Sequence, residues 1–121
     1  MSARKRMRES RRNCLQTEKI EAYLGFARRA GKLTLGVNAI GTLKRGVHLL
    51  LLDGSMAQNS RKEMMKYGAQ FACPLLEAKD LGVLVKKQGC KAAAVRDISL
   101  AKAIFERAEE AGLTTIGGLN G

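Results

Sequence analysis

A run of apolar residues near the middle of the chain, Val47–Leu52, constrains the fold most strongly. Only His48 interrupts it, and it lies between Gly46 and the turn sequence Asp53-Gly54-Ser55. Such a run is too short for an independent helix and suits a strand that is covered on both faces. We therefore expect a sheet with helices packed on both of its sides.

The segment before this run predicts a helix start with exposed polar groups. Lys32–Leu35 has the pattern of a short strand, and Gly36 makes a turn that opens a helix at about Val37. The helix is expected to end at Gly46, because glycine is favoured just after a helix. Its first backbone N–H groups lack partners within the helix, so with polar and cationic neighbours they suit phosphate groups or base edges. Those neighbours are Asn38, Lys32, Lys44 and Arg45.

Helices and strands alternate through the rest of the chain with short joints. This alternation predicts the α/β class, as a three-layer α/β/α sandwich with a small mixed sheet. The other expected elements are a helix Glu18–Ala30 capped by Thr17, a helix from the capping box Ser60–Glu63 to Gly68, a strand Gln70–Leu75 that Pro74 places at a sheet edge, a helix Glu77–Val85, a strand Ala92–Val95, a helix capped by Asp97 or Ser99 that runs to about Ala111, and a short strand Leu113–Ile116. At 121 residues we expect one domain over residues 16–116, with a loose C-terminus at 117–121.

Positive charge is in large excess. The net charge is +11 and the sequence pI is about 10.1, which favours a polyanionic partner. Residues 1–15 hold +5 of this charge, with Glu9 as their one acid and the bases Arg4, Lys5, Arg6, Arg8, Arg11 and Arg12. This basic segment has almost no apolar anchors, so we expect a mobile arm. It is either a tail without function or an arm that orders on nucleic acid.

Several classes of protein are disfavoured. No stretch approaches the roughly 18 consecutive apolar residues of a membrane span, and no apolar run follows the basic N-terminus as in a secretory signal. The cysteines Cys14, Cys73 and Cys90 are odd in number, far apart and without a Cys-x-x-Cys pair, which argues against disulfides and zinc. We therefore expect a cytoplasmic protein in a reducing compartment, without membrane association or cofactor.

Residues with enzymatic potential have simpler interpretations. His48 lies inside the apolar strand, where a packed, hydrogen-bonded imidazole is expected. Asp53, Asp80 and Asp97 fall at turns or helix starts, where capping accounts for them. No cysteine has a predicted histidine beside it, and no Gly-x-Gly-x-x-Gly or P-loop pattern occurs. The sequence therefore predicts a protein that is not an enzyme and holds no metal.

A second basic segment, residues 86–91, forms a glycine-containing loop before the strand Ala92–Val95. Ligands of α/β sheets gather at the loops beyond the carboxyl ends of the strands, so we expect this loop and the segment Lys32–Arg45 to meet at such an edge. The chain has no Trp and few other aromatic residues, which disfavours single-strand binding by stacking. A structured RNA, read by its phosphates and a few base edges, is the expected partner.

The order and spacing of these motifs resemble the L-seven-Ae / L-thirty-e / S-twelve-e ribosomal protein family. The matching residues are Lys32-Leu33-x-x-Gly36-x-Asn38, Leu43-Lys44-Arg45-Gly46, the strand Leu49–Leu52, Asn59-Ser60-Arg61-Lys62, Lys79-Asp80-Leu81-Gly82 and Ala92–Asp97. The resemblance covers roughly residues 17–111 and is greatest to small bacterial, ribosomal-protein-like members. It implies an L-thirty-e-like α/β/α sandwich that binds kink-turn or related RNA.

The family's base-reading signature is incomplete in this chain. In that family Gly-x-Asn-Glu-x-x-Lys opens the second helix and reads sheared G·A pairs, and a loop before a late strand covers a protruding nucleotide. Gly36 and Asn38 match by position, but the acid falls on Ala39 and the lysine on Thr42. A one-residue shift anchored on the glycine that ends this helix instead places Asn38 at the acid and Gly41 at the lysine. The loop at residues 86–91 occupies the covering position and is more basic than the apolar loop of the archaeal members.

Together these observations predict a monomeric, ribosomal-protein-like protein that binds ribosomal or other structured RNA, with the ribosome as a candidate partner. The alternatives are a substrate-recognition accessory module of an RNA-modifying enzyme and a protein-interaction adaptor, the latter disfavoured by the +11 charge. The residues expected to contact RNA are Lys32, Gly36, Val37, Asn38, Gly41, Lys44, Arg45, Lys86, Lys87, Gln88, Gly89 and Lys91.

Overall fold

The computed structural model describes residues 2–116, with side chains from Leu15 onward. Its elements are α1 (Ser2–Arg29), β1 (Leu33–Leu35), α2 (Val37–Gly41), β2 (Leu49–Asp53), α3 (Gln58–Phe71), β3 (Leu75–Ala78), α4 (Leu81–Val85), β4 (Ala92–Val95), α5 (Ile98–Ala108) and β5 (Thr114–Thr115). Strands β1, β4 and β5 lie within the ranges predicted for them. The C-terminus expected to be loose, 117–121, lies outside the described residues.

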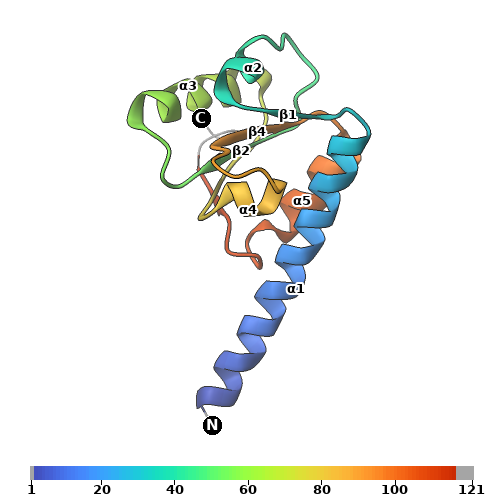
Figure 1. The fold of residues 1–121 in the computed structure, drawn as a ribbon, viewed down its shortest axis with the longest axis vertical. Coiled ribbons are helices and arrows are strands. Elements are labelled where there is room, and N and C mark those ends of the chain that lie inside the picture. The colour runs from blue at the N-terminus through green and yellow to red at the C-terminus, as the bar shows by residue number, and fades with distance from the viewer. Residues whose placement is uncertain (1, 117–121) are drawn as a thin grey trace.

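The strands form one open, mixed sheet in the order β1-β4-β2-β3-β5 (Figure 1). Strands β1, β2 and β3 run in one direction, and β4 and β5 run against them. The ends of β1, β2 and β3 therefore meet the start of β4 at one end of the sheet, where Leu35 pairs with Ala93 and Leu52 pairs with Ala92. We call this the carboxyl end of the sheet.

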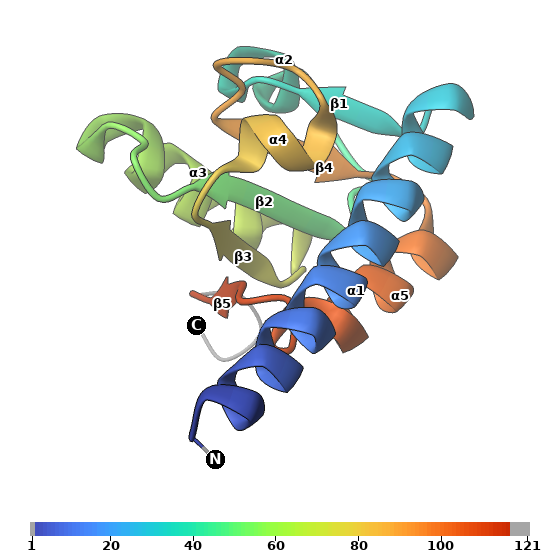
Figure 2. The same ribbon diagram turned by 60° about the horizontal axis from the view of Figure 1, so that its bottom comes forward.

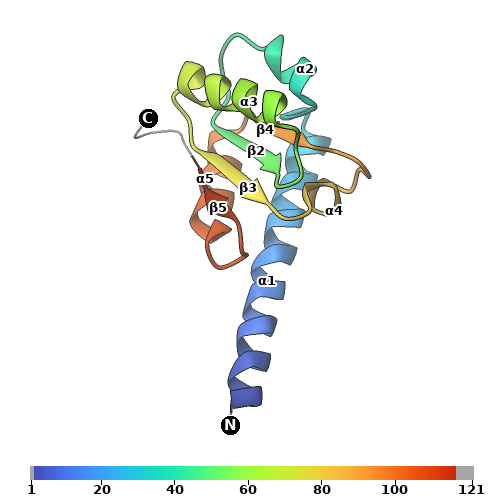
Figure 3. The ribbon, with the colours of Figure 1, turned by 90° about the vertical axis from the view of Figure 1, so that its left-hand side faces the viewer.

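Helices cover both faces of the sheet, with α1, α4 and α5 on one side and α2 and α3 on the other (Figures 2 and 3). The leucines of β2 alternate between the two cores. Leu49 and Leu51 pack under the first layer, and Leu50 and Leu52 pack under the second. The predicted burial of this run on both faces is confirmed, although the strand begins at Leu49 rather than at Val47.

Helix α1 begins far earlier than the sequence predicted. The expected N-cap, Thr17, lies within the helix, and the basic segment before it continues the same helix away from the sheet (Figures 1 and 3). Residues 2–24 contain no glycine or proline and many good helix formers, which accounts for the extension. The mobility of this arm stays a prediction. No helix among residues 2–116 is long and apolar enough to cross a membrane.

Helix α2 is shorter than predicted and ends at Gly41 instead of Gly46. The hydroxyl of Thr42 donates to the Ala39 carbonyl at 2.6 Å, which satisfies an acceptor at the helix end. A Cβ atom on Gly41 would lie 2.7 Å from the Tyr67 hydroxyl oxygen, so α2 rests closely on α3. The end of α2 is therefore packed against α3.

The prediction for the region around Pro74 is wrong in two respects. Of the residues expected as the strand Gln70–Leu75, Gln70 and Phe71 belong to α3 and only Leu75 belongs to β3, which begins directly after the proline. Strand β3 lies between β2 and β5 and is not an edge strand; β1 and β5 form the edges. Helix α4 consequently starts at Leu81 rather than at Glu77.

Of the predicted helix caps, one is confirmed by the structure and one is wrong. Asp97 caps α5, because its carboxylate accepts a hydrogen bond from the Leu100 N–H at 2.9 Å. The capping box Ser60–Glu63 is wrong, since both residues lie inside α3 and the N-cap position is held by Ala57. No side chain caps α3 at that position, and Met64 and Gly68 are the residues that it buries.

The layered core predicts different effects for two neighbouring residues of α5. Ile104 is 0% exposed under the sheet, whereas Phe105 is 40% exposed. In urea unfolding, Ile104→Ala should lower the free energy of unfolding by about 2–5 kcal/mol. Phe105→Ala should lower it by less than about 1 kcal/mol. Equal losses would contradict the face that α5 turns to the sheet.

Candidate functional site

The two predicted basic segments meet only in part, at the carboxyl end of the sheet. The Gly36 N–H donates to the Ala92 carbonyl at 2.9 Å, and the Asp53 N–H donates to the Lys91 carbonyl at 2.9 Å. These bonds place the start of α2, with Asn38, beside the end of the loop that precedes β4. The predicted juxtaposition of loop and helix start is present.

The basic loop, residues 86–91, is folded tightly against α4. The Lys87 N–H donates to the Gly82 carbonyl at 2.9 Å, and the Cys90 N–H donates to the Lys87 carbonyl at 3.1 Å. A Cβ atom on Gly82 would lie 3.0 Å from the Lys87 carbonyl oxygen, so a larger residue at this position would push on the backbone of the loop. Lys86 adopts the left-handed conformation with φ of 56°. The loop backbone is therefore fixed by local bonds.

The side chains of this loop divide into an anchor and an exposed set. Cys90 is buried, and burial raises the pKa of its thiol, so it stays protonated and packs as an apolar group. Its neighbours are exposed, namely Lys86, Lys87, Gln88, Gly89 and Lys91. The loop thus presents three cations to solvent on an ordered backbone.

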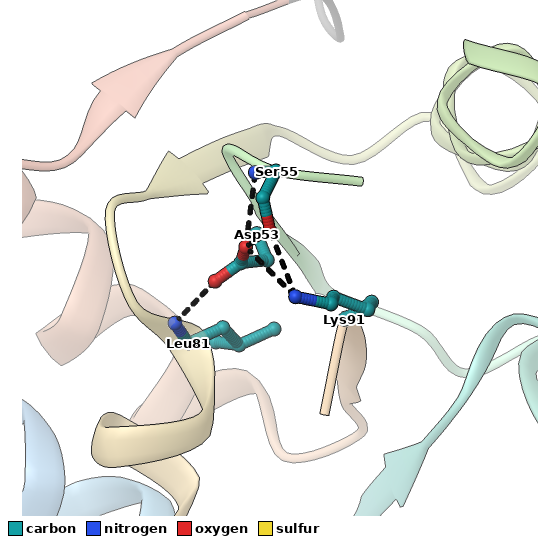
Figure 4. Close-up of polar contacts among 4 residues, drawn as sticks. All are labelled: Asp53, Ser55, Leu81 and Lys91. Carbon is teal, nitrogen blue, oxygen red and sulfur yellow. Dashed lines mark hydrogen bonds and ion pairs between the residues drawn. The ribbon is translucent and has the colours of Figure 1, made fainter. Parts of the chain in front are cut away.

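A buried carboxylate fixes both this loop and helix α4 (Figure 4). Oδ1 of Asp53 accepts from the Leu81 N–H at 2.8 Å, which caps the first turn of α4. Its Oδ2 accepts from the Ser55 N–H at 2.9 Å and from the Ser55 hydroxyl. Lys91 Nζ lies 3.5 Å from Oδ2 and 2.7 Å from the Ser55 Oγ. One side chain at the end of β2 therefore joins the turn after it, the start of α4 and the end of the basic loop.

The charge of Asp53 is stabilised by these contacts. Burial by itself raises the pKa of the carboxyl, but the hydrogen bonds from Ser55 and Leu81 and the ammonium group of Lys91 outweigh it. The pKa is lowered from its ordinary value of 3.8 to about 2. Asp53 was predicted as a turn or capping residue, and it does cap a helix. By contrast, Asp80 occupies the N-cap position of α4 but makes no capping hydrogen bond with its side chain.

Helix α1 supports the other end of α4. The Arg28 guanidinium donates to the Val85 carbonyl at 3.3 Å, directly before the left-handed Lys86. Between α1 and α4 lies a shallow cavity of about 400 Å³ that these residues line together with Glu21 and Arg29. The beginning and the end of α4 are thus held by side chains from β2 and α1.

Three predicted contact residues lie away from this site. Lys32 precedes β1 at the opposite end of the sheet, where its carbonyl accepts from the Arg96 N–H at 2.7 Å. Lys44 and Arg45 lie in the loop after α2, which leads to His48 at that same opposite end. These cations therefore do not join the basic loop.

The start of α2 exposes two of its first residues to solvent. Gly36 has φ of 95°, which favours glycine, and no side chain caps the helix. Val37 is partly buried against the second core, whereas Asn38 and Ala39 are exposed. Asn38 is therefore the polar side chain that this helix start presents to solvent.

Residues suspected of enzymatic potential occupy structural positions. His48 is partly buried directly before β2, and its backbone N–H donates to the Val95 carbonyl at 2.9 Å. Cys73 is buried in the second core, and burial raises the pKa of its thiol to about 11. Cys73 thus contributes to packing, and its thiolate is scarce near neutral pH.

Sequence reasoning missed the residues that position the basic loop. The sequence predicts Asp53 and Ser55 only as residues of a turn, and Arg28 only as part of the last turn of the helix Glu18–Ala30. The one available signal was a lone acid that directly follows a fully apolar strand, a place where a carboxylate becomes buried and requires partners.

Replacing Asp53 should destabilise the protein in a pH-dependent way. Asp53→Ala should lower the free energy of unfolding by about 2–4 kcal/mol at pH 7, because it leaves the Leu81 N–H and Lys91 without their acceptor. Asp80→Ala is the matched control and should cost less than about 0.5 kcal/mol. Urea unfolding of the variants measures both effects.

The pH dependence of stability tests the contribution of the Asp53 charge. Because the pKa of Asp53 is lower in the folded protein, ionisation stabilises the fold above about pH 4, and this contribution disappears as the pH falls toward 2. Asp53→Asn keeps an acceptor for Leu81 but removes the charge. Its stability deficit should therefore shrink below about pH 4, and a deficit that stays constant on acidification would contradict this role for the carboxylate.

Comparisons with known proteins bear on the fold alone. No protein-family model and no curated protein matches the chain. Among solved structures, the chain is similar to a protein of unknown function from Bacillus halodurans C, with a TM-score of 0.61 and 21% sequence identity. The match covers 74% of this chain and 95% of that one. The two proteins share a mixed α/β fold.

Proposed function

We propose that this protein binds structured RNA through the basic loop, residues 86–91, and the adjacent start of α2. The observation that carries the proposal is an exposed set of lysines on a backbone held by Asp53 beside Asn38. Ordered cations contact phosphates without the entropy cost of fixing a flexible loop. The net charge of +11 supports a polyanionic partner.

From the family resemblance we further propose that the chain is an L-thirty-e-like, ribosomal-protein-like member of the L-seven-Ae / L-thirty-e / S-twelve-e family. It would act in the cytoplasm as a monomer, without catalytic activity or cofactor. The mixed sheet between two helical layers and the loop beside the second helix agree with that fold. No observation favours the accessory-module or adaptor alternatives over this one.

The contacts favour recognition led by phosphates over detailed base reading. The Thr42 hydroxyl is bonded to the Ala39 carbonyl, and Gly41 lies against Tyr67. Neither position supplies a free side chain for a guanine edge. Asn38 is the remaining base-directed candidate, so binding should depend on RNA shape and charge with a limited preference among kink-turn sequences.

Lys87→Ala tests the phosphate contacts. If Lys86, Lys87 and Lys91 each contact a phosphate, the logarithm of the binding constant against the logarithm of the salt concentration should have a slope of about −2 to −3. Lys87→Ala should make this slope shallower by about one and weaken a kink-turn hairpin and a scrambled hairpin alike. Fluorescence anisotropy titrations at several salt concentrations measure both quantities.

Lys102→Ala is the control for this variant. Lys102 is exposed on α5, on the face of the sheet opposite α2, and its loss removes the same charge. It should leave the slope within experimental error. Binding that does not respond to salt, or equal effects of the two variants, would contradict the proposed contact surface.

Asn38→Ala tests base-directed recognition. Asn38 makes no capping hydrogen bond, so its replacement should change the free energy of unfolding by less than about 0.5 kcal/mol. It should weaken binding of the kink-turn hairpin by about 1–3 kcal/mol and change binding of the scrambled hairpin little. Wild-type affinity for both hairpins would remove Asn38 from the site and leave the basic loop as the contact surface.

A further inference from the structure

The cavity of about 400 Å³ between α1 and α4 lies directly beside the basic loop, because Lys86 belongs to both. We call it the α1–α4 cavity. Its apolar lining comes from Leu84 and Val85, which are buried in the first core, and from Ala22 and Gly25 of α1. Its volume is in the range of pockets that hold small ligands. The cavity therefore combines an apolar wall with an entrance on the side of the proposed contact surface.

Gly25 keeps this cavity open at a cost to the helix. It lies in the interior of α1, where glycine is less favourable than alanine. A Cβ atom at this position would have no neighbour within 4 Å outside the helix backbone, and its φ lies outside the left-handed region. Neither packing nor backbone geometry requires a glycine here. Its presence indicates that the free space itself is used.

The charged groups of the cavity are separated along α1. Glu18 and Glu21 line one end, and Arg29 and Lys86 line the other. From residue 21 to residue 29 the helix rises about 12 Å. Within residues 15–116 none of these four side chains forms an ion pair. The cavity thus offers carboxylate acceptors at one end and free cations at the other.

We propose that the α1–α4 cavity binds one unpaired nucleotide of the RNA that contacts the basic loop. The inference rests on the proposed function and extends its contact surface to α1. A nucleotide combines an anionic phosphate, which suits Arg29 and Lys86, with hydroxyl and amino groups that donate to a carboxylate such as Glu21. A purely anionic ligand would be repelled by Glu21, and a cation would be repelled by Arg29 and Lys86.

The path of the loop connects the cavity to the start of α2. The loop leaves the end of α4 beside α1 and passes α2 before it enters β4 (Figure 2). Lys86 at its beginning lines the cavity, and Ala92 directly after it binds the Gly36 N–H. An RNA strand that follows the loop from Asn38 therefore reaches the cavity. The nucleotide in question lies beyond the loop, on the side of α1.

Gly25→Leu in the full-length protein tests occupancy, because the leucine side chain fills the cavity. One probe is a kink-turn hairpin with a fully paired flanking stem. The others are the same hairpin with a single unpaired nucleotide at successive positions of that stem. At one position the unpaired nucleotide should tighten wild-type binding about tenfold, as expected for a charge-assisted contact. In anisotropy titrations Gly25→Leu should abolish this gain and bind the fully paired hairpin like wild type.

The stability of this variant and a matched leucine control for misfolding. Gly25→Leu should melt a few degrees above wild type, since leucine is the better helix former. A loss of binding in a more stable protein cannot come from unfolding. Ala69→Leu adds an exposed leucine on α3, on the other side of the sheet, and should keep the gain.

Glu21→Gln distinguishes a hydrogen-bond acceptor from a bystander charge. An acid that lies near RNA without a contact repels the phosphates, so its neutralisation should strengthen binding. If Glu21 accepts from the nucleotide, Glu21→Gln should instead weaken binding of the hairpin with the unpaired nucleotide about tenfold. Glu109→Gln removes an exposed acid at the end of α5 and should weaken binding of neither hairpin.

The outcomes separate this inference from the proposed function. The inference is wrong if no unpaired nucleotide tightens wild-type binding, if Gly25→Leu keeps the gain, or if Glu21→Gln strengthens binding. In each case Lys87→Ala still reports on the basic loop. Wild-type protein that binds no hairpin overturns both proposals. If calorimetry shows that a free ribonucleoside monophosphate binds wild type but not Gly25→Leu, while no unpaired nucleotide tightens hairpin binding, the cavity takes a free nucleotide and the assignment to RNA is overturned.

Discussion

Strand β2 must be covered on both faces, because its four leucines, Leu49–Leu52, are all fully buried. This requirement places one helical layer on each side of the sheet and puts β2 between β4 and β3. The alanines of β4 beside these leucines leave room for the helices to approach closely. The position of the candidate site follows from the same strand, since β2 ends at the carboxyl end of the sheet and delivers Asp53 there.

Asp53 converts the end of a hydrophobic strand into a polar junction. A carboxylate at this depth is tolerated only because backbone N–H groups, a hydroxyl and an ammonium group surround it. Its contacts connect segments far apart in the sequence, from Ser55 to Lys91. The ion pair with Asp53 partly neutralises Lys91, so Lys86 and Lys87 are the cations of the loop that are more available to a ligand.

The elements that local sequence determines were predicted well. The apolar run of β2, the bounds of β4 and the Asp97 cap depend on residues next to one another in the chain. The predicted element boundaries are wrong where tertiary contacts determine them. Gly41, where α2 ends, lies closely against Tyr67 of α3, and Glu77 pairs with Leu52 of β2 as part of a strand. At the site, the proximity of Asn38 to the basic loop followed from the expected topology. The distance of Lys32 from it, and the junction at Asp53, required the strand order, which no local pattern encodes.

The strand order also keeps the most apolar strand away from both edges of the sheet. A segment such as Leu49–Leu52 would pair readily with another copy if it lay at an open edge. The edges are instead β1 and β5, which are three and two residues long. When either edge strand frays, the newly open neighbour is the alanine-rich β4 or the Glu77-containing β3, and β2 remains paired on both sides. The chain can therefore lose its periphery to thermal motion without exposing its most aggregation-prone segment.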